Sequence, residues 1–162
     1  KKDINNIEMK FIDVNVNTEK VEKKHASKTI KNVLTKEEKK TLEFGTHIHE
    51  VLEFTDFKNV DTNNKYIDKL LNTFNFKDAT IYQELEFVFF KDDINYHGII
   101  DLMLEYENEI YVVDYKLKNI DDEEYIKQLG VYYDYVKSIS DKKVSLYLYS
   151  IMDNKTKEIK VG

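Results

Sequence analysis

The segment 110–117, which reads IYVVDYKL, places the strongest constraint on how this chain can fold. A nearly continuous apolar run of this length is typical of a strand that is buried on both faces in the middle of a sheet. Asp114 and Lys116 interrupt the run two residues apart, so in a strand their side chains leave the same face. Because a buried charge is rarely tolerated unless it is paired or used, the segment predicts a central strand with a paired or functional charge.

The residues before this strand predict two helices. Thr35 followed by Glu38 has the pattern of a capping box, and apolar residues at helical spacing continue from there to about Phe54. A second helix is predicted over residues 62–73. The residues expected to line the inner faces of these helices are Leu42, Gly45, Ile48, His49, Leu52, Tyr66, Ile67, Leu70, Leu71 and Phe74.

The remaining periodicity predicts strands and one more helix. Asp121 with Glu124 forms another capping box, and the helix after it would bury one face made of Tyr125, Leu129, Tyr132, Val136 and Ile139. Aromatic and β-branched residues mark the strands. The predicted strands cover residues 80–90, 99–106, 110–117, 143–151 and 157–161, with a turn over 91–98. This order of elements predicts an α/β fold with a mixed central sheet flanked by helices.

The chain has 162 residues, which is enough for one domain with a buried core. Residues 1–35 are polar, and we expect an N-terminal arm or the remnant of a preceding region there, with the domain itself over 36–162.

No apolar run is long enough to cross a bilayer, and no signal peptide is visible at the N-terminus. We therefore expect a cytoplasmic protein without a membrane partner.

The amino-acid composition limits the kinds of metal site and of nucleic-acid binding that the chain can provide. The sequence contains no cysteine, which excludes disulfides, thiolate zinc sites, iron–sulfur clusters and cysteine nucleophiles. A metal ion would be held by oxygen or imidazole ligands, which favours Mg²⁺ or Mn²⁺. The formal net charge of -6 argues against a protein that grips nucleic acid by bulk electrostatics. If the substrate is nucleic acid, a larger basic neighbour is expected to deliver it.

Asp101 completes a candidate site with the charged pair of the central strand. It follows Gly98-Ile99-Ile100 on the preceding strand, and a short hairpin would bring it beside Asp114. Two adjacent carboxylates repel unless a divalent cation lies between them. Such a cation polarises a phosphate and lowers the pKa of a bound water, and Lys116 beside it would stabilise charge on the phosphorus. The arrangement favours phosphodiester hydrolysis.

Each candidate residue also has a purely structural interpretation. A D-x-K triplet is common, and a buried Asp–Lys ion pair would explain it equally well. Gln128 and Tyr132 lie four apart on one helix face, where Gln128 could bond a DNA end or a phosphate and Tyr132 could be core. His49 lies on an apolar helix stripe, where a core histidine is the commoner outcome. Glu84 in a strand would usually be solvated.

Five short motifs, taken in order, resemble the PD-(D/E)XK nuclease superfamily. More narrowly, they resemble the C-terminal nuclease domain of RecB/AddA-type helicase–nuclease subunits, and the resemblance covers roughly residues 40–151. The spacing of five motifs in the right order is more specific than any one of them. The motifs are G-T-x-x-H at 45–49, Q-E-x-E-F at 83–87, G-I-I-D at 98–101, D-Y-K at 114–116 and Q-x-x-x-Y at 128–132.

The resemblance implies a restriction-endonuclease-like fold and a role for each matched residue. The implied metal ligands are His49, Asp101, Asp114 and the backbone carbonyl of Tyr115, with Glu84 assisting. Lys116 would be the catalytic lysine, and Gln128 and Tyr132 would orient the active site or contact DNA. A proline often precedes the first catalytic aspartate in the wider superfamily. Here Ile100 precedes Asp101, as is usual in this branch.

The expected activity is that of a Mg²⁺-dependent deoxyribonuclease, acting as an exonuclease of a helicase–nuclease in double-strand break repair and recombination. The expected partners are DNA, a helicase motor in the same full-length chain and a second helicase–nuclease subunit. The sequence has no G-x-x-x-x-G-K-[ST] motif, so a motor would lie upstream or on a partner. The alternatives are an inactive nuclease fold that serves as a DNA-binding or scaffold module, and a stand-alone restriction- or phage-type nuclease.

Overall fold

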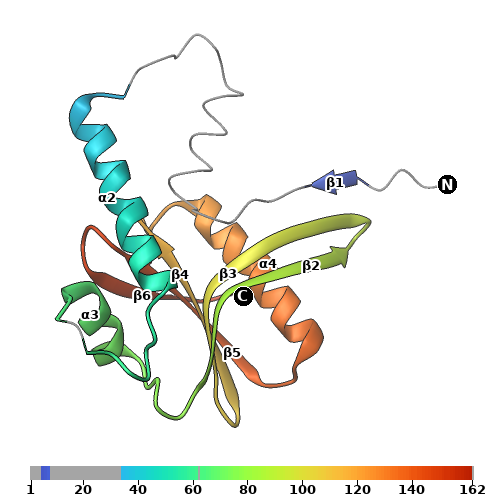
Figure 1. The fold of residues 1–162 in the computed structure, drawn as a ribbon. Coiled ribbons are helices and arrows are strands. Elements are labelled where there is room, and N and C mark those ends of the chain that lie inside the picture. Colours follow the sequence, from blue (N-terminus) through green and yellow to red (C-terminus); the bar gives the residue numbers. More distant parts are fainter. Residues whose placement is uncertain (1–4, 8–33, 62, 162) are drawn as a thin grey trace.

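Strand β4 (Glu109–Lys116) lies inside a mixed sheet whose strand order is β1-β3-β4-β5-β6, with β2 pairing on β3 (Figure 1). The computed structural model describes residues 5–7, 34–61 and 63–161. The other strands are β1 (Asn5–Ile7), β2 (Thr80–Lys91), β3 (Ile94–Glu105), β5 (Lys143–Ser150) and β6 (Lys155–Ile159). The helices are α2 (Lys36–Glu53), α3 (Lys65–Thr73) and α4 (Glu123–Ile139). The α/β fold with a mixed central sheet is confirmed.

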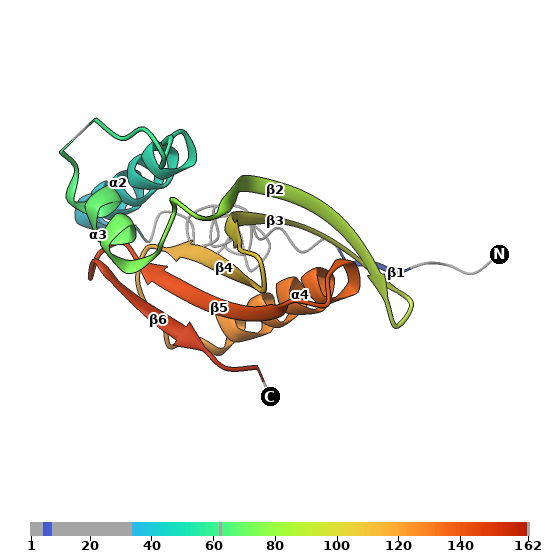
Figure 2. The same ribbon diagram turned by 90° about the horizontal axis from the view of Figure 1, so that it is seen from below.

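Helices cover the two faces of the sheet separately. Figure 2 shows α2 and α3 on one side and α4 on the other. Helix α4 connects β4 to β5. The two strands run parallel, and parallel neighbours need a crossover connection of this kind. One core, the α2/α3 core, gathers residues such as Ile48, Leu52, Leu70, Leu102, Val113 and Tyr115. The other, the α4 core, gathers residues such as Phe87, Ile100, Val112, Leu129, Tyr132 and Leu148.

The first two predicted helices are present. Thr35 caps α2 by accepting a hydrogen bond from the Glu38 N–H at 3.1 Å, and the helix ends at Phe54 as predicted. Helix α3 begins three residues later than the expected position 62, because the Asn64 side chain accepts hydrogen bonds from the first N–H groups of the helix. Ile67 is buried there as expected.

The predicted turn over 91–98 is wrong. Strand β3 begins at Ile94, so only Asp92 and Asp93 connect the two strands of a long hairpin. Both residues have positive φ angles, 52° and 61°, which is the geometry of a two-residue hairpin turn. Aspartate tolerates that geometry better than most residues.

The cap of α4 is also one residue away from the prediction. Asp122 accepts a hydrogen bond from the Glu124 N–H at 2.9 Å, whereas Asp121 pairs with Lys157. Val136 ends the buried stripe of this helix, and Ile139, expected on it, is 60% exposed. The strand prediction over 143–151 matches β5, and the last strand, predicted over 157–161, begins and ends two residues earlier.

Two further predictions concern the N-terminal arm and the crossing of a membrane. Most of the predicted N-terminal arm, residues 1–35, lies outside the described residues, so its division from residues 36–162 stays a prediction. Among the described residues, no helix has the length and apolar character that a membrane crossing would need.

Candidate active site

Strands β3 and β4 separate where their charged residues begin. Their antiparallel pairing runs from Glu105↔Ile110 to Leu102↔Val113, so Asp101 and Asp114 would be the next pair. At that level the Tyr115 N–H donates to Asp101 Oδ2 at 2.7 Å. Asp101 is 1% exposed and Asp114 is fully buried. The hairpin predicted from the sequence therefore brings the two carboxylates together inside the protein.

Glu84 lies opposite Asp101 from the other side of β3. Strand pairs flank it as Gln83↔Leu102 and Leu85↔Ile100, which leaves Glu84 at the level of Asp101. Its φ angle of 50° falls in the left-handed region, which is uncommon for a residue with a side chain. Strained backbone of this kind is frequent at functional sites.

The unusual backbone at Glu84 coincides with a reversal of the two faces of β2. Ile81 packs in the α2/α3 core, whereas Leu85 packs in the α4 core, although a separation of four residues would place both on one face of a regular strand. Strand β3 reverses at the same level, between Ile100 and Leu102. The two strands thus turn the Glu84 and Asp101 carboxylates out of regular alternation and toward α2.

Helix α2 supplies His49. The helix comes close to Leu117, the residue that follows β4. A Cβ atom added to Gly45 would lie only 2.5 Å from Leu117 Cδ1. One turn further along, His49 Nε2 lies 3.2 Å from Asp101 Oδ1, and its ring meets the edge of the Tyr115 ring. Glycine at position 45 therefore permits the approach that brings the imidazole to the carboxylates.

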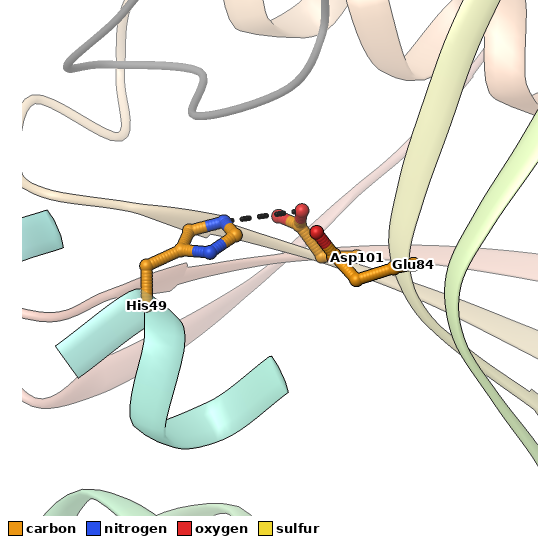
Figure 3. Close-up of side chains that lie close together, drawn as sticks. All are labelled: His49, Glu84 and Asp101. Carbon is orange, nitrogen blue, oxygen red and sulfur yellow. Dashed lines mark ion pairs between the residues drawn. The ribbon is translucent and has the colours of Figure 1, made fainter. Parts of the chain in front are cut away.

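Three side chains form a candidate metal site. His49, Glu84 and Asp101 each place a ligand atom within 4.8 Å of the others, and Figure 3 shows the imidazole directed at the two carboxylates. Glu84 Oε2 and Asp114 Oδ1 are buried, and neither accepts a hydrogen bond from the part of the chain that the structure describes. Buried acceptors are ordinarily satisfied, and hard oxygen and imidazole ligands suit a divalent cation. The donor set fits Mg²⁺ or Mn²⁺.

Lys116 lies beside this site and is fully buried. Its Nζ is 2.5 Å from Asp114 Oδ2, donates a hydrogen bond to Gln128 Oε1 and lies 4.3 Å from the centroid of the Tyr125 ring. These contacts fix the ammonium in one place. The positioning comes from β4 on one side and from the first turns of α4 on the other.

Gln128 and Tyr132 continue this network to the backbone of β3. Gln128 Nε2 donates to the Tyr132 hydroxyl at 3.4 Å, and that hydroxyl donates to the Ile99 carbonyl at 2.8 Å. Both side chains are buried, and Tyr132 belongs to the α4 core. The network therefore links Lys116 to the strand that carries Asp101.

Burial dominates the protonation of the site. It raises the pKa of Glu84 to about 8, helped by the charge of Asp101, and it raises the pKa of Asp114 well above its usual value, against the opposing effect of Lys116. Burial likewise lowers the pKa of Lys116. At Asp101, burial alone would raise the pKa, but the neighbouring His49 holds it below its usual range. A cation among these groups would favour the ionised carboxylates.

The structure brings the predicted site residues together. His49, Glu84 and Asp101 converge, and Asp114, Lys116, Gln128 and Tyr132 form the adjoining network. Tyr115 contributes its N–H to Asp101, while its carbonyl remains a predicted ligand. The sequence reasoning missed the ring of Tyr125 over Lys116 and the contacts of Gln83 with the end of α2. For Gln83, its place beside Glu84 in the second motif was the available signal.

Comparison with known proteins supports the nuclease interpretation. The model of the PD-(D/E)XK nuclease superfamily matches residues 19–161. One relative, from Clostridioides difficile (strain 630), is a subunit of an ATP-dependent helicase/nuclease and is 29% identical over 92 residues. That alignment covers 48% of this chain and 7% of the relative. The chain therefore corresponds to a small part of the relative's length.

Proposed function

The chain belongs to the PD-(D/E)XK nuclease superfamily, and from that premise we propose that it hydrolyses phosphodiester bonds in DNA with Mg²⁺ or Mn²⁺ as cofactor. One observation carries the proposal: His49, Glu84 and Asp101 place ligand atoms within 4.8 Å of one another. The buried ion pair of Asp114 and Lys116 adjoins them. Together they offer ligands for a cation and a fixed ammonium for a phosphate.

The convergence of their ligand atoms assigns His49, Glu84 and Asp101 to the metal ion, which they would hold together. Membership of the superfamily adds Asp114 and the Tyr115 carbonyl as further proposed ligands. When bound, the ion polarises the phosphate and lowers the pKa of a water molecule.

The residues around the ammonium complete the catalytic group. Lys116 donates hydrogen bonds to the phosphate oxygen on which negative charge develops. Asp114 and Gln128 hold its Nζ in position, and Tyr132 holds Gln128. An ammonium fixed in advance contributes more to the transition state than one that must be ordered during the reaction.

The finer role is that of an exonuclease within a helicase–nuclease that processes double-strand breaks. The similarity to a subunit of an ATP-dependent helicase/nuclease supports the association with a helicase. So does the net charge of -6, because an acidic nuclease domain benefits from a motor that feeds DNA to it. The partners in this proposal are DNA, a helicase motor in the same full-length chain and a second helicase–nuclease subunit. We place this assembly in the cytoplasm.

The complete burial of Asp114 and Lys116 favours a second candidate, an inactive nuclease fold that acts as a DNA-binding or scaffold module. A scaffold would keep the ion pair closed and would not take up metal. An active enzyme would bind Mn²⁺ at the carboxylates. A titration of the purified chain with Mn²⁺ discriminates between the two.

The test of the proposed function is cleavage of end-labelled single- and double-stranded linear DNA in Mg²⁺, Mn²⁺ or EDTA. We expect metal-dependent cleavage that Asp114→Asn abolishes. The matched control is Asp134→Asn on α4, whose carboxylate pairs with Lys91 on the surface, and its rate should equal that of the unmodified chain. No cleavage together with no Mn²⁺ binding would contradict the proposal.

A further inference from the structure

The side chain of Gln83 closes the C-terminal end of α2. The two N–H groups of its Nε2 are shared among three carbonyl oxygens, those of Leu52 at 3.0 Å, Glu53 at 3.1 Å and Thr55 at 2.9 Å. The last carbonyls of a helix have no partner within the helix, and α2 has no basic residue in its last turn to supply one. The Leu52 carbonyl accepts from the Thr55 N–H at 3.3 Å, and the neutral amide from β2 adds the side-chain contacts at this helix end.

His49 lies between two points at which α2 is held. Gly45, four residues earlier, allows the close approach to Leu117, and Leu52, three residues later, accepts a hydrogen bond from Gln83. With a rise of about 1.5 Å per residue, the two points are about 6 Å and about 4.5 Å from His49 along the axis. These two contacts fix the segment of α2 that carries His49, so the loss of either contact would let the imidazole move.

Gln83 also precedes Glu84, whose φ of 50° turns its carboxylate toward His49. Two consecutive residues of β2 thus serve the same neighbouring helix. One holds the helix end, and the other meets the imidazole of that helix at the candidate metal site. The placement of His49 relative to Glu84 depends on this short stretch of strand.

We propose that Gln83 is a positioning residue of the metal site, whose amide fixes the end of α2 so that His49 reaches Glu84 and Asp101. The proposal rests on the metal site of the proposed function. It adds a residue outside the ligand set, acting through the helix that carries His49.

The test is calorimetric titration of the whole chain with Mn²⁺, in the unmodified form and with Gln83→Met or Gln83→Glu. Methionine keeps the length of the side chain and removes the donors, and we expect Mn²⁺ affinity to fall about 10- to 100-fold, as it does when residues that orient ligands are lost. Glutamate adds a negative charge, which by attraction alone would tighten binding. Weaker binding in Gln83→Glu is therefore the result that positioning predicts, because a carboxylate cannot donate to the three carbonyls.

The control is Asn64→Ala, which removes the side-chain cap of α3. It should lower the melting temperature and leave Mn²⁺ affinity unchanged, so a general loss of stability is separated from a loss of positioning. Unchanged affinity in Gln83→Met overturns the proposal, as does an equal loss in Asn64→Ala.

A second readout does not need metal. The NMR signals of the His49 ring report its contact with Asp101 in the metal-free protein, and we expect Gln83→Met to shift them and Asn64→Ala to leave them in place. If the unmodified chain binds no Mn²⁺, the metal site of the proposed function fails and the positioning of a metal ligand fails with it. If it binds Mn²⁺ in a Gln83-dependent way but cleaves no DNA, only the proposed activity fails.

Discussion

Two Lys–Asp ion pairs of similar length lie in opposite surroundings in this protein. Lys116 Nζ and Asp114 Oδ2 are 2.5 Å apart, and both side chains are fully buried. Lys91 Nζ and Asp134 Oδ2 are 2.7 Å apart, and the two side chains are 44% and 39% exposed. Both members of the first pair lie on β4, within the candidate active site, whereas the second pair ties the tip of the β2–β3 hairpin to α4.

The difference in burial separates the pair that we propose to be functional from a pair on the surface. Removing two charges from water costs several kcal/mol per ion in a protein interior, and apolar residues of similar volume often replace such a pair without loss of stability. A surface pair has little such cost and contributes little, because solvent and salt screen it. Stability alone therefore does not explain why charges occupy the centre of β4, whereas the proposed phosphate chemistry does.

Lys116→Met tests this comparison with the largest expected effect. The ammonium is lost, so we expect the rate of DNA cleavage to fall roughly 100- to 1000-fold, as for other groups that stabilise transition-state charge. The fold should persist, because Asp114, whose pKa burial already raises, takes up a proton. Single-turnover cleavage and circular dichroism measure the two effects. An undiminished rate would show that the buried pair has no part in catalysis.

Glu84, half-buried, lies between the two extremes and predicts a pH effect. Its pKa is raised from 4.5 to about 8, so the folded metal-free protein keeps a proton that the unfolded chain has lost. The contribution to stability is complete below about pH 4.5 and is lost as the pH rises toward 8. We expect the melting temperature of the metal-free protein to fall over this range, and less steeply in Glu84→Gln. An identical slope in the variant would contradict the burial argument.

Two helix glycines, Gly45 and Gly130, offer the same contrast between crowded and open surroundings. Gly45→Ala would place a Cβ against Leu117, and we expect overpacking to cost about 1–3 kcal/mol and to weaken Mn²⁺ binding by displacing His49. The matched control is Gly130→Ala on α4, where nothing lies within 4 Å of the new Cβ. Because alanine favours the helix, that variant should gain about 0.5–1 kcal/mol. Denaturant unfolding distinguishes the opposite signs, and a stabilised Gly45→Ala would refute the close approach.

Lys91→Met is expected to have the smallest effect. The Asp134 carboxylate that it leaves behind remains in contact with solvent, so the melting temperature should change by less than about 3 °C. DNA cleavage should continue at the rate of the unmodified chain. A large loss of either stability or activity would remove the contrast with Lys116, because the surface pair would then itself contribute to stability or catalysis.

Local pattern determined much of this protein in advance. The apolar run around Asp114 and Lys116 predicted the central strand, and the capping box of Thr35 predicted the start of α2. Helical spacing placed His49 on the inner face of α2. These features depend on residues near one another in the chain, where periodicity and capping chemistry act directly.

Features that depend on residues far apart in the chain became visible only in the folded protein. The reversal of β2 at Glu84 and the amide of Gln83 at the end of α2 were not predicted. Each involves backbone conformations or partners that a single segment does not specify, since a positive φ persists only where the surrounding packing holds it. Residue types and their spacing along the chain identified the groups that could form a site. The docking of α2 on the sheet, between Gly45 and Gln83, decided that the imidazole and carboxylates meet.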